Sequence, residues 1–349
     1  MNDKVLFLSL SVCVAFLLMV FITKARAGSI RIQIPPMVFR FIFVVLFLFL
    51  IAYAFAVFGG SLSFANIANI YDQRYLAGDL SAGTIAGYAT GILSGCFNPL
   101  LIAYGLRYRL KSALLVGIAG QVFVYMTFAM KSVLLSVIII PVFYYVCLRR
   151  DNISWRGIAG ISIALLSSPL IMEIFIGGES SPVYDGVVAL VYMRTFGMVG
   201  VLTGIYYDFF LYNPFTLYSH INIIGTFFEY PYNASVGEVI GASMGIDANA
   251  NANFFATDGI AAAGLFGILI IGVVVGLAMR AFDAIIPSEN LRMICAAAVP
   301  SIVNLANASF FTTLLTNGLF LLVVLGSAWR FHKQENVRWL EASRSSSMR

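Results

Sequence analysis

The chain has 349 residues, of which 60% are hydrophobic and 11% are charged, whereas about a quarter of the residues are charged in an ordinary soluble domain. This composition excludes a soluble globular domain and indicates a membrane protein. The net charge of +5 and the pI near 9.0 would suit either a polyanionic partner or an oriented membrane protein, and the positions of the charges decide between these two interpretations.

Apolar segments recur along the chain, and most are long enough for a helix to cross a hydrocarbon core of about 30 Å. Their polarity does not alternate over about ten residues, as it would in the strands of a transmembrane barrel. We therefore predict an all-α polytopic membrane protein in which residues 1–349 form a single integral membrane domain. The predicted spans lie near residues 5–22, 37–58, 84–105, 112–130, 132–148, 157–176, 260–279, 292–308 and 313–328.

Lysine and arginine collect on one side of these spans. With the amino terminus outside, 17 of the 21 cations lie on or beside the same side, as the positive-inside rule describes for the cytoplasmic face. The basic balance thus orients the protein and implies no nucleic-acid partner, and the tail 330–349 is expected to be cytoplasmic. The four outward cations are Lys4, Arg74, Lys131 and Arg194.

The amino-terminal segment resembles a signal peptide, but its apolar core is too long and its cations follow it, so we interpret it as a retained span. The four cysteines lie in apolar segments and cannot be assigned as a disulfide framework. The two histidines are far apart, which leaves no metal-ligand spacing. No phosphate-binding Gly-Lys-Ser/Thr motif is present. We predict neither a metal nor a cofactor.

Two outward connections are long, namely residues 59–83 and 177–259. The longer one should be ordered, because residues 206–232 include eleven aromatic side chains, which disordered segments lack. Residues 186–205 are about one span long, so they either cross the bilayer and return through 209–228 or form a re-entrant helix. Both alternatives leave the two ends of this connection on the outer side, and they predict nine to eleven spans in total.

Two kinds of residue shape the predicted helices of this long connection. Gly197, Gly200 and Gly204 form a small-residue face suited to close helix packing. Pro214 and Pro231 should break any helix that follows Asp208.

Arg194 lies in this apolar stretch, where a guanidinium costs roughly 2.5–3.5 kcal/mol at membrane depth. Its planar donors suit a phosphate or pyrophosphate. The structural alternative is an ion pair with Asp208 or Glu179 that locks a helix. Arg74 is a second outward cation, for which the alternative is a pair with a nearby aspartate.

Polar and aromatic residues downstream suit a sugar substrate. Asp208 or His220 is a candidate base for an attacking hydroxyl, and the candidates for sugar contacts are Tyr206, Tyr207, Asn251, Asn253 and Asp258. Each has a structural alternative. The tyrosines suit an aromatic belt, His220 suits a hydrogen-bonded structural role, and Asp258 suits a helix cap before Ile260.

The same residues carry a resemblance to a known family. Arg194 with its glycine-bearing helix, the YYDFF sequence at 206–210, Asn213-Pro214 and Ser219-His220 resemble the large periplasmic loop of oligosaccharide repeat-unit polymerases, the Wzy-type O-antigen and capsule polymerases. The sequence NANANFFATDG at 249–259, which enters a span containing GLFG, is similar to the segment after that loop. The resemblance covers residues 185–280.

This resemblance implies a glycosyltransferase that acts at the outer, periplasmic face of a bacterial inner membrane. Its donor and acceptor would be undecaprenyl-pyrophosphate-linked oligosaccharides, and membrane lipid and a chain-length regulator are the other expected partners. Arg194 would bind the pyrophosphate, with Arg74 as a weaker second, and Asp208 or His220 would be the base.

Other classes remain as alternatives. A lipid-linked oligosaccharide flippase would line a path with polar groups, whereas these spans are nearly free of them. A surface-glycan ligase carries a histidine motif that His220-Ile221 does not fit, and a purely structural subunit would not need an ordered aromatic loop.

Overall fold

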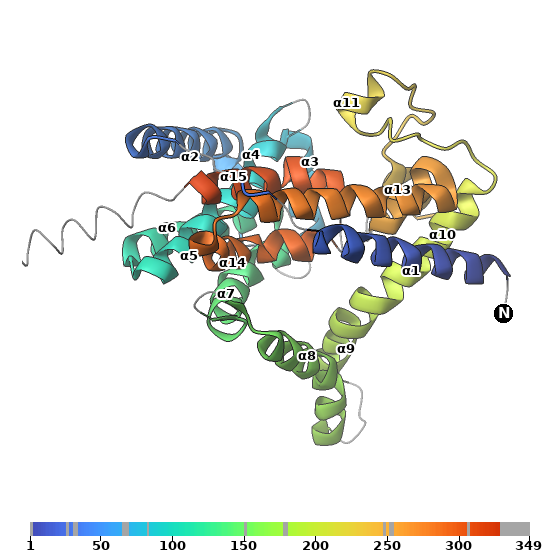
Figure 1. Cartoon of the computed structure of the whole chain (residues 1–349), viewed down its shortest axis with the longest axis horizontal. Coiled ribbons are helices and arrows are strands. Elements are labelled where there is room, and N and C mark those ends of the chain that lie inside the picture. The colour runs from blue at the N-terminus through green and yellow to red at the C-terminus, as the bar shows by residue number, and fades with distance from the viewer. Residues whose placement is uncertain are drawn as a thin grey trace, which may run out of the picture. The chain divides into compact units, whose positions relative to one another are not determined.

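The computed structural model describes residues 3–25, 28–30, 34–64, 70–81, 84–149, 152–176, 181–246, 249–250, 255–305 and 308–328. For residues 71, 149, 152, 176, 182, 183, 190, 194–196, 222 and 223 the description covers the backbone alone. The regular secondary structure of the described chain is helical (Figure 1), apart from a short antiparallel ladder. In this ladder β1 (Leu148–Arg149) pairs with β2 (Asn152–Ile153). This confirms the predicted all-α class.

The chain divides into two compact units. The first unit comprises Met1–Ala27, Trp155–Ala281 and Ile302–Thr313, and the second comprises Gly28–Ser154, Phe282–Ser301 and Leu314–Arg349. The candidate site lies in the first unit.

The second unit is a helical bundle in which glycines permit close packing. A Cβ on Gly105 or Gly117 would lie 2.6 or 2.8 Å from backbone atoms of the facing helix, so only glycine fits there. Its elements are α2 (Pro36–Phe58), η1 (Gly59–Ser61), α3 (Ile70–Ser81), α4 (Ala86–Ile92), the π-helix η3 (Leu93–Phe97), α5 (Asn98–Tyr108), α6 (Lys111–Phe128), α7 (Lys131–Val146), most of α14 (Ser288–Asn304) and α15 (Leu319–Ala328).

The outward connection 59–83 contains the helix α3, which a buried glutamine ties to the bundle. The Gln73 side chain is 9% exposed, and its amide nitrogen donates to the backbone oxygens of Ser61 (3.0 Å), Met126 (2.8 Å) and Thr127 (3.1 Å). The last two are carbonyls at the end of α6, which have no partner within their own helix. Gln73 therefore caps α6 and positions α3.

The first unit contains α1 (Asp3–Lys24), α8 (Trp155–Ile176), α9 (Pro182–Val188), the π-helix η4 (Ala189–Gly197), α10 (Met198–Phe210), α11 (Asn222–Gly225), α12 (Val236–Ser243), most of α13 (Phe255–Ile285) and the first two residues of the π-helix η5 (Thr312–Thr316). As predicted, no helix continues through Pro214 or Pro231.

Helix α1 runs beside α13 (Figure 1) along a small-residue face. A Cβ on Gly272 would lie 2.8 Å from the Ala15 side chain, and one on Gly276 would lie 3.1 Å from the Cα of Met19. This GxxxG spacing lets two apolar helices approach closely. The predicted packing face on α10 differs, because a Cβ on Gly200 or Gly204 would meet no described atom within 4 Å.

Helix α13 is broken near its start, which the predicted span 260–279 did not anticipate. Ala263 (φ −159°, ψ 35°) and Gly264 (φ 60°, ψ −142°) leave the helical region, and glycine tolerates the positive φ. The chain reverses there, so that Gly259 and Gly267 touch through their backbones: a Cβ on Gly267 would lie 1.9 Å from the Gly259 oxygen. The first part, Phe255 to Ala262, is buried throughout.

Six helices of the described chain are long and apolar enough to cross a bilayer. A seventh span results if Tyr184–Met193 and Met198–Phe210, which meet at a 48° bend, are counted as one. The protein is thus a multi-pass α-helical membrane protein. Helices α7 and α15 are shorter and apolar, so the count of nine to eleven spans stays a prediction.

Candidate functional site

The break in α13 anchors the aromatic loop that follows α10. A helix that stops leaves its last carbonyls without partners, and here they accept hydrogen bonds from the loop. The Thr216 backbone N–H donates to the Ala261 oxygen at 2.8 Å, and the Leu217 N–H donates to the Ala262 oxygen at 3.2 Å. The Thr216 hydroxyl also donates to the Ala261 oxygen at 3.1 Å. The loop and the start of α13 therefore form one structure.

Aromatic packing holds the rest of this loop. The ring of Tyr232 lies 6.1 Å from that of Phe209 and 6.2 Å from that of Phe210, and its hydroxyl donates to the Pro214 oxygen at 2.6 Å. The Phe210 and Phe215 rings stack at 6.3 Å. The ring contacts join the end of α10 to the loop, and the Tyr232 hydrogen bond joins two parts of the loop, so the aromatic side chains hold this connection together.

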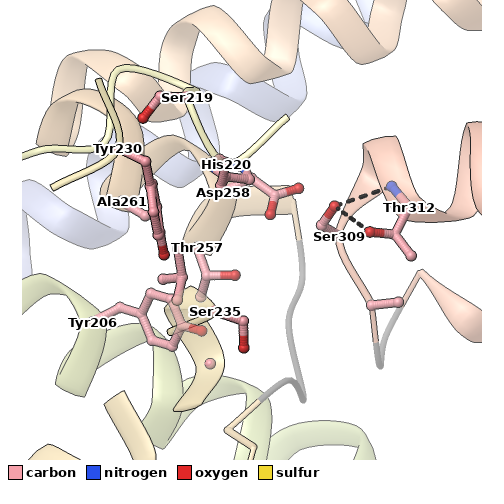
Figure 2. Close-up of a pocket in the computed structure, with 13 residues that line it drawn as sticks. Tyr206, Ser219, His220, Tyr230, Ser235, Thr257, Asp258, Ala261, Ser309 and Thr312 are labelled. Carbon is pink, nitrogen blue, oxygen red and sulfur yellow. Dashed lines mark hydrogen bonds between the residues drawn. The ribbon is translucent and has the colours of Figure 1, made fainter. Parts of the chain in front are cut away.

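These elements enclose a pocket of about 380 Å³. Figure 2 shows its labelled side chains reaching inward from α10, the aromatic loop, the start of α12, the start of α13 and the segment before η5. Seven of the thirteen described lining residues carry a hydroxyl group, and apolar and polar surface both contribute to the wall. The lining residues are Tyr206, Ser219, His220, Tyr230, Ser235, Val236, Gly237, Thr257, Asp258, Ala261, Ala308, Ser309 and Thr312.

Asp258 is the acidic residue of the described pocket wall and is only 4% exposed. The predicted cap before Ile260 is wrong, because α13 already begins at Phe255 and Asp258 lies in its first turn. Its carboxylate instead accepts the backbone N–H of Phe310 at 2.9 Å, and Figure 2 shows it pointing toward the segment of Ser309. Ser309 accepts the N–H of Thr312 at 3.1 Å. Asp258 thus accepts a hydrogen bond from the backbone at the start of a helical segment, where an N–H has no partner within its own helix.

His220 lines the same pocket, and its Nδ1 lies 3.3 Å from the Thr216 hydroxyl oxygen. Burial lowers the pKa of His220 to about 4, because a buried imidazolium loses its hydration. The ring is therefore neutral at neutral pH. Burial, and next the charge of Asp258, raise the pKa of Tyr218, whose hydroxyl donates to the Gly267 oxygen at 3.3 Å.

The helical period of α10 decides which of its candidate residues face the pocket. Leu202, Tyr206 and Phe210 are buried at four-residue intervals, and this spacing defines one face of a helix. Tyr206 is 1% exposed and donates from its hydroxyl to the Ala250 oxygen at 3.2 Å. Tyr207 and the exposed Asp208 lie on other faces and do not line the pocket.

Of the other predicted residues, Arg74 lies in α3 of the second unit, where it is exposed and donates to the Ala129 oxygen at 3.4 Å. The backbone of Arg194 belongs to η4, but its side chain lies outside the description, so neither its pyrophosphate role nor its ion-pair alternative is tested. Asn251 and Asn253 also lie outside the described residues.

The sequence interpretation missed most of the hydroxyl groups of the wall. Ser235 had a local signal, because it forms a capping box with Glu238 at the start of α12. The pattern Ser309 to Thr312 likewise marks a helix start. Both signals locate a helix end, and neither shows that it borders a pocket. In the described chain no three His, Cys, Asp or Glu side chains lie close enough together to hold a metal ion.

Comparison of the chain with protein-family models, with curated proteins and with solved structures gives no match. The function of this protein is therefore inferred from its own residues.

Proposed function

We propose that the protein is a membrane-embedded glycosyltransferase that polymerises undecaprenyl-pyrophosphate-linked repeat units into O-antigen or capsular polysaccharide, as its resemblance to the Wzy-type polymerases implies. One observation carries the proposal. The segment that bears the resemblance supplies ten of the thirteen described lining residues of a pocket of about 380 Å³, and among these ten are a buried aspartate and a neutral imidazole. Convergent polar groups in a concave site of this size suit a small polar ligand such as a sugar.

In the proposed reaction, a hydroxyl at the non-reducing end of the acceptor attacks the anomeric carbon of the donor glycan. The new carbon–oxygen bond forms as the bond from the anomeric carbon to pyrophosphate breaks, and undecaprenyl pyrophosphate leaves with the electron pair. Asp258 would orient the attacking hydroxyl. His220, neutral because its pKa is about 4, would accept the hydroxyl proton. Arg194 would stabilise the charge that develops on the pyrophosphate.

The proposal also assigns the membrane arrangement. Nine to eleven spans would lie in the bacterial inner membrane, with residues 59–83 and 177–259 on the periplasmic side and residues 330–349 in the cytoplasm. The 17 cations on one side support this orientation. Nucleotides are absent from that outer side, which suits a donor whose leaving group is a lipid pyrophosphate. A chain-length regulator would be a protein partner.

The decisive variant is Arg194→Ala. It should abolish polymer while membrane insertion and protein amount stay unchanged, and Arg194→Lys should restore little because lysine lacks the planar pair of donors. Lys131→Ala removes another outward cation and serves as the matched control. Polymer of normal length and amount from Arg194→Ala would refute the assignment of the pyrophosphate to this residue.

Deletion of the gene separates the proposed class from its rivals on a gel of surface polysaccharide. Loss of the ladder with one capped repeat unit retained indicates a polymerase. Loss of the single unit as well indicates a flippase or a surface-glycan ligase, and an unchanged ladder excludes all three.

A further inference from the structure

The charge of the pocket wall is distinctive. None of the described lining residues is lysine or arginine. His220 carries no charge at neutral pH, because its pKa is about 4. Asp258 is therefore the residue of this wall that can carry charge near neutral pH, and that charge is negative.

A ligand with its own negative charge would be poorly accommodated in such a pocket. A carboxylate or phosphate that enters a confined site loses hydration, and this loss is offset only by a cation or by several donated hydrogen bonds. No described lining side chain is a cation, and an ionised Asp258 would repel the ligand. If Asp258 were protonated, the repulsion would vanish but the missing counter-charge would remain.

An uncharged sugar, in contrast, needs no counter-charge in this pocket and is not repelled by Asp258. Its hydroxyls can donate to the Asp258 carboxylate and can exchange hydrogen bonds with Ser235, Ser309 and Thr312, which line the wall. Tyr230, which is half-buried, adds aromatic surface next to them. Ser235 and Thr312 are exposed, whereas Asp258 is buried, so a sugar hydroxyl passes exposed wall residues to reach the carboxylate. In the proposed reaction this hydroxyl belongs to the end of the acceptor chain.

We propose that this pocket is the subsite for the terminal sugar of the acceptor, that it selects an uncharged sugar over a hexuronic acid, and that it does not bind the pyrophosphate of the donor. This inference rests on the proposed function, which it deepens by naming the class of the acceptor sugar. The residues that carry it are Asp258, which disfavours an anion, and the hydroxyl-bearing wall, which satisfies a neutral ring. The pyrophosphate then requires a cation elsewhere, in agreement with the role proposed for Arg194.

Binding to the full-length protein in lipid nanodiscs tests the inference. The probes are a neutral hexose disaccharide and its counterpart with a hexuronic acid at the non-reducing end, each measured by saturation-transfer NMR at pH 7.5. We expect the neutral probe to bind at least about tenfold more tightly, since an uncompensated charge costs more than the roughly 1.4 kcal/mol that a factor of ten represents. Inorganic pyrophosphate should not displace the neutral probe.

Two variants change the wall charge in a defined way. Asp258→Asn removes the carboxylate and should reduce the preference for the neutral probe over the acidic probe. Val236→Lys adds a cation to the wall and should reduce or reverse that preference. Asp208→Asn removes an exposed carboxylate that does not line the pocket, so it should leave the preference unchanged.

Equal binding of the two probes to the wild-type protein, tighter binding of the acidic probe, or no binding of either would overturn the inference, whatever the variants do. The binding experiment tests the subsite, and the polysaccharide gel of the deletion strain tests the proposed function, so failure of one can be distinguished from failure of the other. A lost polymer ladder in the deletion strain without sugar discrimination would leave the polymerase standing and remove the subsite. Discrimination with an unchanged ladder would retain a sugar pocket and remove the polymerase.

Discussion

The reversal within α13 makes one substitution especially informative. In Gly267→Ala, the added Cβ would lie 1.9 Å from the Gly259 oxygen and 2.8 Å from the Gly259 carbonyl carbon. Both are backbone atoms, so no side-chain rotation relieves the clash. The two parts of α13 must therefore move apart at the point where they touch.

The size of the effect follows from this geometry. The Cβ must retreat from 1.9 Å to at least 3.0 Å from the Gly259 oxygen, and Gly259 and Gly267 are both buried. Overpacking of this kind costs about 1–3 kcal/mol or more, which lowers a melting midpoint by roughly 1–4 °C or more for a chain of this size. The movement also shifts the Ala261 and Ala262 carbonyls that anchor the aromatic loop, so sugar binding to the pocket should weaken as well.

The assay is thermal unfolding of the purified protein in one detergent, together with binding of the neutral disaccharide. Gly200→Ala is the matched control, because it makes the same chemical change on a helix where the new Cβ meets no described atom within 4 Å. It should keep binding and unfold at the same temperature or slightly higher, since alanine favours a helix by up to about 1 kcal/mol. Equal midpoints and equal binding for the two variants would refute the close backbone contact and the reversal.

Two further predictions concern pH and the outward helix α3. Burial lowers the pKa of His220 from 6.5 to about 4, so the unfolded chain binds more protons between these values. This contribution to the free energy of unfolding is complete above pH 6.5 and falls by about 3 kcal/mol as the pH drops to 4; His220→Gln should flatten that part of a denaturation series, and an unchanged slope would contradict the burial. Gln73→Leu removes the amide donor of the Met126 and Thr127 carbonyls at the end of α6, of which Met126 keeps the Ser63 N–H at 3.2 Å. The substitution should cost about 1–3 kcal/mol, with faster proteolysis of residues 59–83. Asp72→Asn, an exposed neighbour, is its control, and equal proteolysis of the two variants would exclude the capping role.

The sequence located the helices well because hydropathy is a local property. The span predicted at 37–58 is α2 (Pro36–Phe58), and the one predicted at 157–176 is α8 (Trp155–Ile176). Each needs only a continuous run of apolar residues, which satisfies its own backbone hydrogen bonds as a helix in lipid. The break in α13 escaped prediction because Ala263-Gly264 permits either a continuous helix or a reversal, and contacts with Gly267 and the aromatic loop select the reversal.

The candidate site was predicted only in part, because residue chemistry can be recognised locally whereas packing between distant segments cannot. His220 and Asp258 were named from their chemistry, and both line the pocket. Asp208 was predicted as a base alongside His220, but it lies on an exposed face of α10, whereas Tyr206 lies on the buried face. A one-dimensional pattern gives the period of a helix, whereas its rotation toward a neighbouring segment depends on what that neighbour is.

By itself, the sequence determined that this protein is helical, lies in a membrane and carries an ordered aromatic connection, because composition and periodicity act between near neighbours. Only the tertiary structure decided that Asp258 meets Phe310, 52 residues away, and that hydroxyl groups from distant segments share its pocket. Contacts of this kind arise from packing between parts of the chain that are far apart in sequence, which no local pattern specifies.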